Sequence, residues 1–272
     1  MNDFMQLVQS ATLLRILLAT VWGVCLGSLI NVVVYRLPRM LLAGRSRFNL
    51  FLPTSHCPHC KTPICWWDNI PLLSWLCLAG RCRHCSVAIS RRYPLVETGF
   101  MVNALLLAYW IPTSELLVAA MLLSGFLLTL SLIDIDCKLL PDSLTLPLLW
   151  AGLLFHLLMP DSQVTLQMAV IGAVAGYIVL WLLYWLFYFS TRREGLGYGD
   201  FKLLAALGGW LGWQNLPLLL LLAAVTGIVA VLLGRHWSGR SLEEPFAFGP
   251  CLALAGWVLF LWLYCPKPLF SI

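Results

Sequence analysis

Charged residues are scarce in this sequence. Lys and Arg number 17 and Asp and Glu 12 among 272 residues, so charged side chains make up 11% of the chain, whereas soluble domains carry about 25%. This scarcity excludes an ordinary water-soluble globular domain. A cleaved signal peptide is also not indicated, because residues 1–12 contain no Lys or Arg and the following apolar run ends without a small-residue cleavage site. We expect that run to be retained as a first membrane span.

Apolar residues take the place of the missing charge. They make up 61% of the chain, with a mean hydropathy of +0.87. Apolar stretches of about 20 residues recur, which is the length needed to cross a bilayer core. The pattern predicts an all-α polytopic membrane protein with about eight transmembrane helices. The expected spans are 13–35, 94–112, 114–133, 144–159, 166–190, 201–213, 216–234 and 247–264. The sixth is short and rich in glycine, which predicts a helix that is tilted or partly buried in protein.

The basic residues indicate the orientation of these spans. Nine of them lie in or beside segment 36–93, and six more lie in loops that an eight-span arrangement puts on the same side: Arg36, Arg39, Arg45, Arg47, Lys61, Arg81, Arg83, Arg91, Arg92, and Lys138, Arg192, Arg193, Lys202, Arg235, Arg240. Because Lys and Arg favour cytoplasmic loops, we expect segment 36–93 to be cytoplasmic and both chain ends to lie outside. Topology explains the net charge of +5, so no nucleic-acid partner is expected.

Three parts follow from this arrangement. We expect a first transmembrane span at 1–35, a small cytoplasmic zinc-knuckle segment at 36–93, and a seven-span core at 94–272. No internal repeat is evident by eye. The spacing Gly172-x-x-x-Gly176 predicts a close contact between helices, because two small residues on one face let backbones approach.

Two of the short cysteine spacings point to a metal. The pairs Cys57/Cys60 and Cys82/Cys85 each have the form Cys-x-x-Cys and are separated by 21 residues. Four thiolates in this pattern predict a closed tetrahedral zinc site with Zn–S distances of about 2.3 Å. Such a site has no open position for water, so the zinc is expected to be structural and to stabilise a segment with few apolar residues to bury.

Other uses of these cysteines stay open. The same ligand set accepts iron in a rubredoxin-type centre. Disulfides conflict with a cytosolic location, and a redox Cys-x-x-Cys is disfavoured because there are two pairs. Nearby histidines could replace a ligand: His56, His59 and His84. The symmetric spacing favours the four cysteines.

Several aspartates stand where an apolar run stops. The sequence IDIDCKLLPD places Asp134 directly after Ile133, followed by Asp136 and Asp142. Asp142 or Ser143 can cap the next helix, and Asp136 can be a solvated loop residue. Asp134 is the closest of the three to the hydrocarbon.

A further aspartate lies in the sequence GLGYGD. Gly195, Gly197 and Gly199 precede Asp200, and we expect them to allow positive φ and a close approach of another segment. Asp134 and Asp200 are both predicted at cytoplasmic ends of spans, where ionisable groups are costly and usually functional. Two carboxylates at one depth that approach each other would share a proton, as in aspartic proteases. Alternatively each pairs with Lys138 or Lys202, or caps a helix.

These motifs together resemble the bacterial type IV prepilin peptidases, also called leader peptidase/N-methyltransferases. The resemblance covers nearly the whole chain. It rests on GSLINVVVYRLP at 27–38, the two Cys-x-x-Cys pairs, RYPLVE at 92–97, IDIDCKLLPDSLT at 133–145 and GYGDFKL at 197–203.

The resemblance implies an intramembrane aspartyl peptidase of the GxGD type in the bacterial inner membrane. Asp200 then supplies one catalytic carboxylate, and Asp134 supplies the other because Pro141 lies seven residues on; Asp136 is its main rival. The implied substrates are prepilins or pseudopilins of type IV pili or type II secretion, cut after a glycine at the cytoplasmic face. Glu243 and Glu244 could attract the basic leader, or could simply belong to a solvated loop.

The family also methylates the new N-terminal residue with S-adenosylmethionine. The resemblance maps this activity to the cytoplasmic segment, with Gly80 and the zinc knuckles as supports. This sequence has Cys25-Leu26-Gly27-Ser28-Leu29 where family members often carry Glu-Phe-Gly-Ser-Phe. The alternatives are a peptidase without methylase activity, or a zinc-stabilised membrane carrier or scaffold whose aspartates bind cations.

Overall fold

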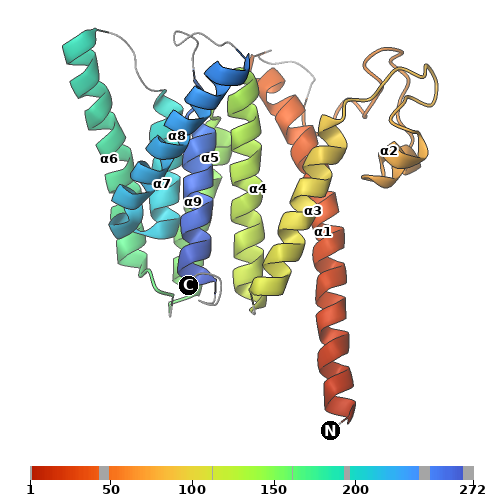
Figure 1. Cartoon of the computed structure of the whole chain (residues 1–272), viewed down its shortest axis with the longest axis horizontal. Coiled ribbons are helices and arrows are strands. Elements are labelled where there is room, and N and C mark those ends of the chain that lie inside the picture. Colours follow the sequence, from red (N-terminus) through yellow and green to blue (C-terminus); the bar gives the residue numbers. More distant parts are fainter. Residues whose placement is uncertain are drawn as a thin grey trace. The chain divides into compact units, whose positions relative to one another are not determined.

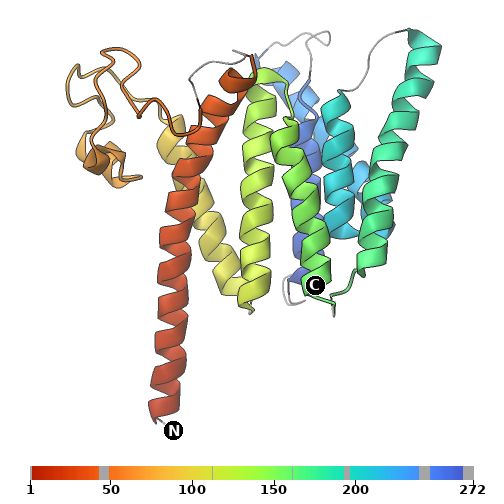
Figure 2. The same cartoon turned by 180° about the vertical axis from the view of Figure 1, so that it is seen from behind.

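The computed structural model describes residues 2–42, 49–111, 113–160, 162–192, 197–238 and 246–265, with side chains from Leu13 onward. The described residues form helices and no strands, which confirms the all-α prediction (Figures 1 and 2). The main helices are α1 (Asn2–Leu42), α2 (Leu73–Cys77), α3 (Arg92–Trp110), α4 (Ser114–Cys137), α5 (Asp142–Leu158), α6 (Leu166–Thr191), α7 (Tyr198–Leu211), α8 (Leu216–Ser238) and α9 (Gly249–Tyr264). The chain divides into two compact units, Met1–Met121 and Leu122–Ile272.

The length and composition of the helices agree with part of the membrane prediction. Within the described residues, four helical stretches are long and apolar enough to cross a membrane: Leu13–Leu42, Ser114–Cys137, Leu166–Thr191 and Trp213–His236. Helices α5 and α9 are apolar but shorter. Each expected span corresponds to a helix, and eight crossings stay a prediction.

In the first unit, α1 and α3 pack closely along two glycines of α1 (Figure 1). A Cβ atom on Gly27 would lie 2.8 Å from Cα of Glu97, and one on Gly23 would lie 2.8 Å from Cβ of Ala104. The two backbones therefore approach as closely as small residues permit. This contact explains why a glycine precedes Ser28 in the motif GSLINVVVYRLP.

The second unit is built around α7. This helix has 14 residues, and it packs against α5, α6 and α9. From Phe201 to Leu211 its side chains are buried except that of Lys202, which is partly exposed. The indole N–H of Trp210 donates to the carbonyl of Leu148 at 2.9 Å. The prediction that the short, glycine-rich span is buried in protein is confirmed.

The predicted contact at Gly172 and Gly176 is also confirmed, and α7 is its partner. A Cβ on Gly172 would lie 2.3 Å from the carbonyl oxygen of Gly208, and one on Gly176 would lie 2.7 Å from that of Leu204. Side chains larger than hydrogen have no room where α6 crosses α7.

We expect Gly208→Ala to destabilise the second unit. Its new Cβ would lie 2.1 Å from the backbone oxygen of Gly172, and overpacking of this kind costs about 1–3 kcal/mol. The thermal unfolding midpoint of the detergent-solubilised protein should fall. Gly234→Ala is the matched control, since a Cβ there meets nothing within 4 Å. Equal midpoints for both variants would contradict the packing argument.

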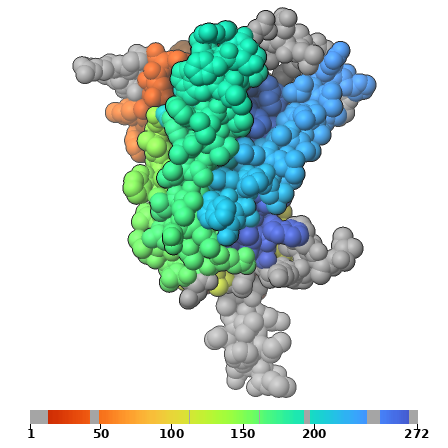
Figure 3. Space-filling model, turned by 90° about the vertical axis from the view of Figure 1, so that its left-hand side faces the viewer, coloured from red at the N-terminus to blue at the C-terminus, as the bar shows by residue number. Residues whose placement is uncertain are grey.

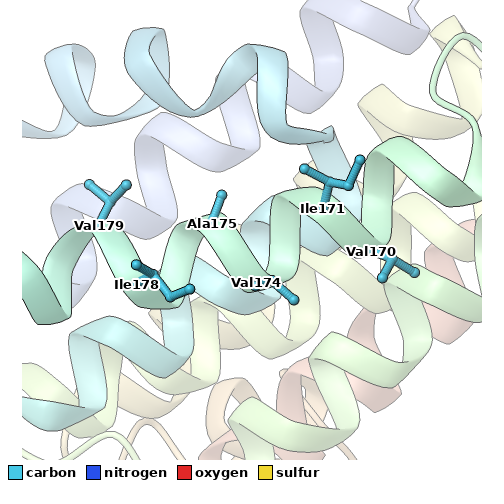
Figure 4. A pocket seen from close by; sticks show the side chains of 6 residues that line it. All are labelled: Val170, Ile171, Val174, Ala175, Ile178 and Val179. Atoms are coloured by element: carbon cyan, nitrogen blue, oxygen red, sulfur yellow. The ribbon is translucent and has the colours of Figure 1, made fainter.

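Figure 3 shows α6 in green on the face toward the viewer. Its exposed side chains from Val170 to Val179 are mostly aliphatic. A shallow hollow of about 440 Å³ lies along it, as Figure 4 shows, lined by Val170, Ile171, Val174, Ala175, Ile178 and Val179. None of these side chains can titrate or bind an ion, so the hollow carries no chemistry. It is the kind of surface that lipid chains cover.

Candidate active site and metal site

Asp134 lies near the C-terminal end of α4 and is buried, with 6% of its surface exposed. The backbone N–H of Gly249, the first residue of α9, donates to Oδ2 of Asp134 at 2.9 Å. A carboxylate that is separated from water needs such donors, because an unsatisfied buried charge is costly. Gly249 was not identified from the sequence, since nothing in a single sequence links positions so far apart.

Asp200 lies in the first turn of α7 and is also buried, with 7% of its surface exposed. Gly197 caps this helix, and the N–H of Asp200 donates to the Gly197 carbonyl at 3.1 Å. The charge of Asp134 acts directly on Asp200, so the structure brings the two predicted carboxylates into one site. A pair of this kind holds a shared proton more readily than two negative charges.

Of the two lysines that could pair with the buried aspartates, Lys202 has another partner. Nζ of Lys202 donates to both carboxylate oxygens of Asp142, at 2.6 and 2.7 Å. Lys202 therefore neutralises Asp142, on α5, and is not the partner of Asp200. The charge of Lys138 does act on Asp134, so that pairing stays open.

Helix capping by Asp142 or Ser143 is not observed. Helix α5 begins after Pro141, and this cap residue forms no side-chain hydrogen bond. Asp142 lies in the first turn instead, where its charge faces the positive end of the helix dipole. The prediction was wrong because the remote Lys202, which the local sequence does not reveal, binds this side chain.

Asp136, the main rival of Asp134, is exposed at the same end of α4. Successive positions two residues apart point to different faces of a helix, so only one of the two aspartates faces the interior of the second unit. Burial beside Asp200 favours Asp134, and the catalytic assignment stays a prediction.

Of the glycines before Asp200, Gly199 is the one at which the structure shows a need for space. Gly197 has φ −79°, so the expected positive φ is wrong there, and Gly195 lies outside the described residues. A Cβ on Gly199 would lie 2.7 Å from Cβ of Leu140. The expected close approach is therefore found at Gly199, where α7 begins against the segment that follows α4.

The four cysteines of the two pairs form one cluster in the first unit. Their sulfur atoms lie within 4.8 Å of one another, with Cys57 to Cys85 at 3.7 Å and Cys60 to Cys82 at 4.0 Å. Tetrahedral zinc with Zn–S bonds of about 2.3 Å requires sulfur–sulfur distances of about 3.8 Å. The cluster therefore fits a metal ion of this size, and the sulfurs are too far apart for disulfides.

Each Cys-x-x-Cys pair is held in the same turn. The N–H of Cys57 donates to the carbonyl of Thr62, and the N–H of Lys61 donates to the carbonyl of Cys57. In the second pair, the N–H of Cys82 donates to the carbonyl of Val87, and the N–H of Ser86 donates to the carbonyl of Cys82. Lys61 and Ser86 both have positive φ, at 60° and 55°. A local structural repeat thus exists that the sequence did not reveal by eye.

The thiols of the cluster differ in acidity. Hydrogen bonds from the side chain and backbone of Thr62 lower the pKa of Cys60 to about 6. At Cys85 a hydrogen bond with the Val87 backbone favours the thiolate, but burial and the neighbouring sulfurs outweigh it and raise the pKa to about 11. Without a positive ion the four sulfurs do not all ionise at neutral pH, whereas metal ligands must be deprotonated.

The histidine alternatives are not part of this cluster. Among the described residues, the group of potential ligands that could hold an ion consists of Cys57, Cys60, Cys82 and Cys85. Nδ1 of His56 lies 3.0 Å from the carbonyl oxygen of Thr54, which gives this ring a local partner. The choice between zinc and iron is not made by this geometry.

Gly80 has a conformational reason to be glycine. Its φ is +68°, and a Cβ would lie 2.8 Å from Cζ2 of Trp75. Gly80 thus allows the chain to turn under the Trp75 ring into the second cysteine pair. Its predicted place near the methyl donor is not tested by this geometry.

Glu97 is a buried acid within the motif RYPLVE, and it was not predicted to be a site residue. Its Oε2 accepts the N–H of Leu72 at 2.8 Å, and Ser28 of α1 is a second hydrogen-bond partner. Leu72 has φ 60°, an uncommon conformation for a branched residue. Glu97 therefore links the cysteine-bearing segment to α3. In the sequence, the feature that could have indicated its role is an acidic residue at the start of an apolar run.

Comparison with known proteins agrees with the division of the chain into two units. The model of the bacterial peptidase A24 N-terminal domain matches residues 21–111, and that of the type IV leader peptidase family matches residues 121–232. A prepilin leader peptidase/N-methyltransferase of Aeromonas salmonicida is 48% identical over 96% of both chains. The chain belongs to the type IV leader peptidase family. The first match ends at residue 111 and the second begins at residue 121, beside the boundary between the two units of the structure.

Other relatives in the leader peptidase family carry the same name. The protein of Pectobacterium carotovorum subsp. carotovorum is 50% identical over 87% of this chain and 89% of its own length. That of Neisseria gonorrhoeae is 44% identical over 89% of each. No solved structure matches the chain significantly.

Proposed function

We propose that this protein removes the leader from type IV prepilins or pseudopilins and then N-methylates the new N-terminal residue. The observation that carries the proposal is the pair of buried carboxylates, Asp134 and Asp200, in a chain of the leader peptidase family. Relatives nearly half identical over almost their whole length bear the name of both activities, which supports the second one.

The peptidase chemistry follows from two acids that share one proton. The ionised carboxylate takes a proton from water, and the resulting hydroxide attacks the scissile carbonyl carbon while the protonated acid donates to the carbonyl oxygen. The tetrahedral intermediate then collapses, with the C–N bond breaking and a proton passing from the pair to the leaving amine. We assign these roles to Asp134 and Asp200 jointly.

We further propose the membrane arrangement that this chemistry needs. Eight crossings by α1 and α3–α9 would put both chain ends outside and the ends of α4 and α7 that carry the aspartates at the cytoplasmic face of the inner membrane. Water reaches a scissile bond there more easily than at the midplane. The basic segment 36–93 then lies in the cytoplasm, with 1–35 as the first span and 94–272 as the peptidase core. Glu243 and Glu244 lie outside the described residues.

For the metal we propose structural zinc held by Cys57, Cys60, Cys82 and Cys85. Zinc suits a closed site of four thiolates. For methylation we propose S-adenosylmethionine as donor, with the segment around Gly80 as part of its site. When bound, this cofactor supplies the methyl group, and the chain has to orient the new N-terminal amine toward it.

A single assay tests both activities. The purified protein should shorten a prepilin precursor after its leader, and the product should take up label from S-adenosylmethionine carrying a labelled methyl group. Cleavage without label would leave a peptidase that lacks the methylase. No cleavage of prepilin or pseudopilin precursors would contradict the proposal and favour a carrier or scaffold.

A further inference from the structure

We propose that Gly249 is a positioning residue for leader cleavage: its amide holds the Asp134 carboxylate, and its lack of a side chain leaves the space that this carboxylate occupies. The inference rests on the proposed peptidase function and adds a third element to the aspartate pair. The contact of Gly249 in the site is with Asp134, so we expect its effect to pass through that carboxylate.

The start of helix α9 offers Asp134 a hydrogen-bond donor. Helix α9 begins with Gly249 and Pro250 after the cap residue Phe248. The first N–H groups of a helix have no partner within it, so that of Gly249 is available, and it donates to Oδ2 of Asp134 at 2.9 Å. Pro250 has no N–H, which leaves Gly249 without a competing donor next to it. The positive end of the α9 dipole also favours a negative charge here.

Gly249 also leaves room for the Asp134 carboxylate. A Cβ atom on Gly249 would lie 2.7 Å from Oδ2 and 3.2 Å from Cγ of Asp134. Its φ is not positive, so a left-handed backbone is not the reason for glycine. Pro250 follows in the helix, and a residue with a Cβ is disfavoured in a helical conformation before proline. Glycine therefore suits this position both by the room that it leaves beside the carboxylate and by its place before proline.

The side chain of Leu140 lies beside both Gly249 and Gly199. A Cβ atom on Gly249 would lie 3.2 Å from Cδ2 of Leu140. A Cβ atom on Gly199 would lie 2.7 Å from Cβ of the same leucine. Gly199 directly precedes Asp200. Leu140 thus packs against the N-termini of α7 and α9 together, and the same contact sets the position of both aspartates.

The chemical consequence is a fixed orientation for one acid. With Oδ2 of Asp134 held by the amide, the carboxylate cannot rotate freely, and Oδ1 is the oxygen that we expect to face water and the partner acid. Moving a reacting group by about 1 Å can cost about 10²-fold in rate. A substitution that pushes Asp134 aside should therefore act on turnover and not on substrate binding.

The experiment compares three glycine variants by steady-state cleavage of a prepilin precursor peptide and by thermal unfolding. We expect Gly249→Ala to lower kcat of the folded protein about 10²-fold with KM near that of the wild type, and its unfolding midpoint to fall no further than that of Gly256→Ala. Gly256→Ala, on the same helix, would place a Cβ 2.5 Å from Cδ2 of Leu207, so its midpoint should fall while kcat of the folded protein stays near wild type. Gly234→Ala should change neither.

A second variant separates the amide from the space. Glycolic acid in place of Gly249 replaces the amide by an ester, which removes the N–H and adds no side chain. A hydrogen bond to a charged group is worth about a tenfold rate effect or more, so kcat should fall by about that factor. If Gly249→Ala does not fold, the ester variant still tests whether the amide positions Asp134.

Each outcome has a defined meaning. Wild-type kcat in both Gly249 variants would overturn the inference. A loss of kcat in Gly249→Ala that merely follows a loss of folded protein, as in Gly256→Ala, together with full activity of the ester, would assign Gly249 a packing role only. A wild-type protein that cleaves no precursor would remove the proposed function first, and the positioning role with it.

Discussion

Asp134→Asn and Asp200→Asn should each lower the rate of leader cleavage by about 10²–10⁴-fold. An amide in place of either buried carboxylate cannot take up or release the shared proton, although it has nearly the same shape. Because the two acids act as one unit, the double variant should lose no more activity than either single variant. Single-turnover cleavage of a precursor peptide measures this directly.

The matched control is Asp136→Asn. Asp136 lies on the same turn of α4 as Asp134 but is exposed, so its variant should keep nearly full activity. Unfolding midpoints of all variants should stay close together. Loss of activity in Asp136→Asn, with Asp134→Asn still active, would move the catalytic assignment to Asp136.

Cys57→Ser should release the metal from the segment that carries the four cysteines. Cys57 is the buried member of the cluster, with 5% of its surface exposed. Structural zinc contributes on the order of 10 kcal/mol in small domains, so residues 49–91 should become sensitive to protease when the fourth ligand is lost. Metal analysis and limited proteolysis of the purified protein are the measurements.

Cys65→Ser provides the control for this variant. Cys65 lies in the same segment but is exposed and outside the cluster, so metal content and protease resistance should not change. Cleavage should suffer less than methylation in Cys57→Ser, because the cysteines lie in the first unit and the aspartates in the second. Wild-type protein with neither zinc nor iron would contradict the metal site.

The sequence was informative where the chemistry is local. The spacing of Cys57, Cys60, Cys82 and Cys85 predicted a cluster because two short turns can each present two sulfurs to one point. The apolar runs predicted the helices, and the shortness and glycines of α7 predicted its burial. These features depend on residues a few positions apart, which a single sequence displays.

The sequence failed where a partner comes from far along the chain. It gave Asp142 a capping role, whereas Lys202 from α7 binds it. It could not indicate that the amide of Gly249 meets Asp134, or that Glu97 accepts the N–H of Leu72. Each of these contacts depends on which helices pack together, and helix packing is set by shape along whole faces.

The burial of α7 has a consequence for how the enzyme would respond to its lipid surroundings. Helices in contact with lipid adjust their tilt when bilayer thickness changes. Helix α7 packs against α5, α6 and α9 over most of its length, so acyl chains hardly reach it. The acid that it carries should keep its place in membranes of different composition, while the outer helices absorb the mismatch.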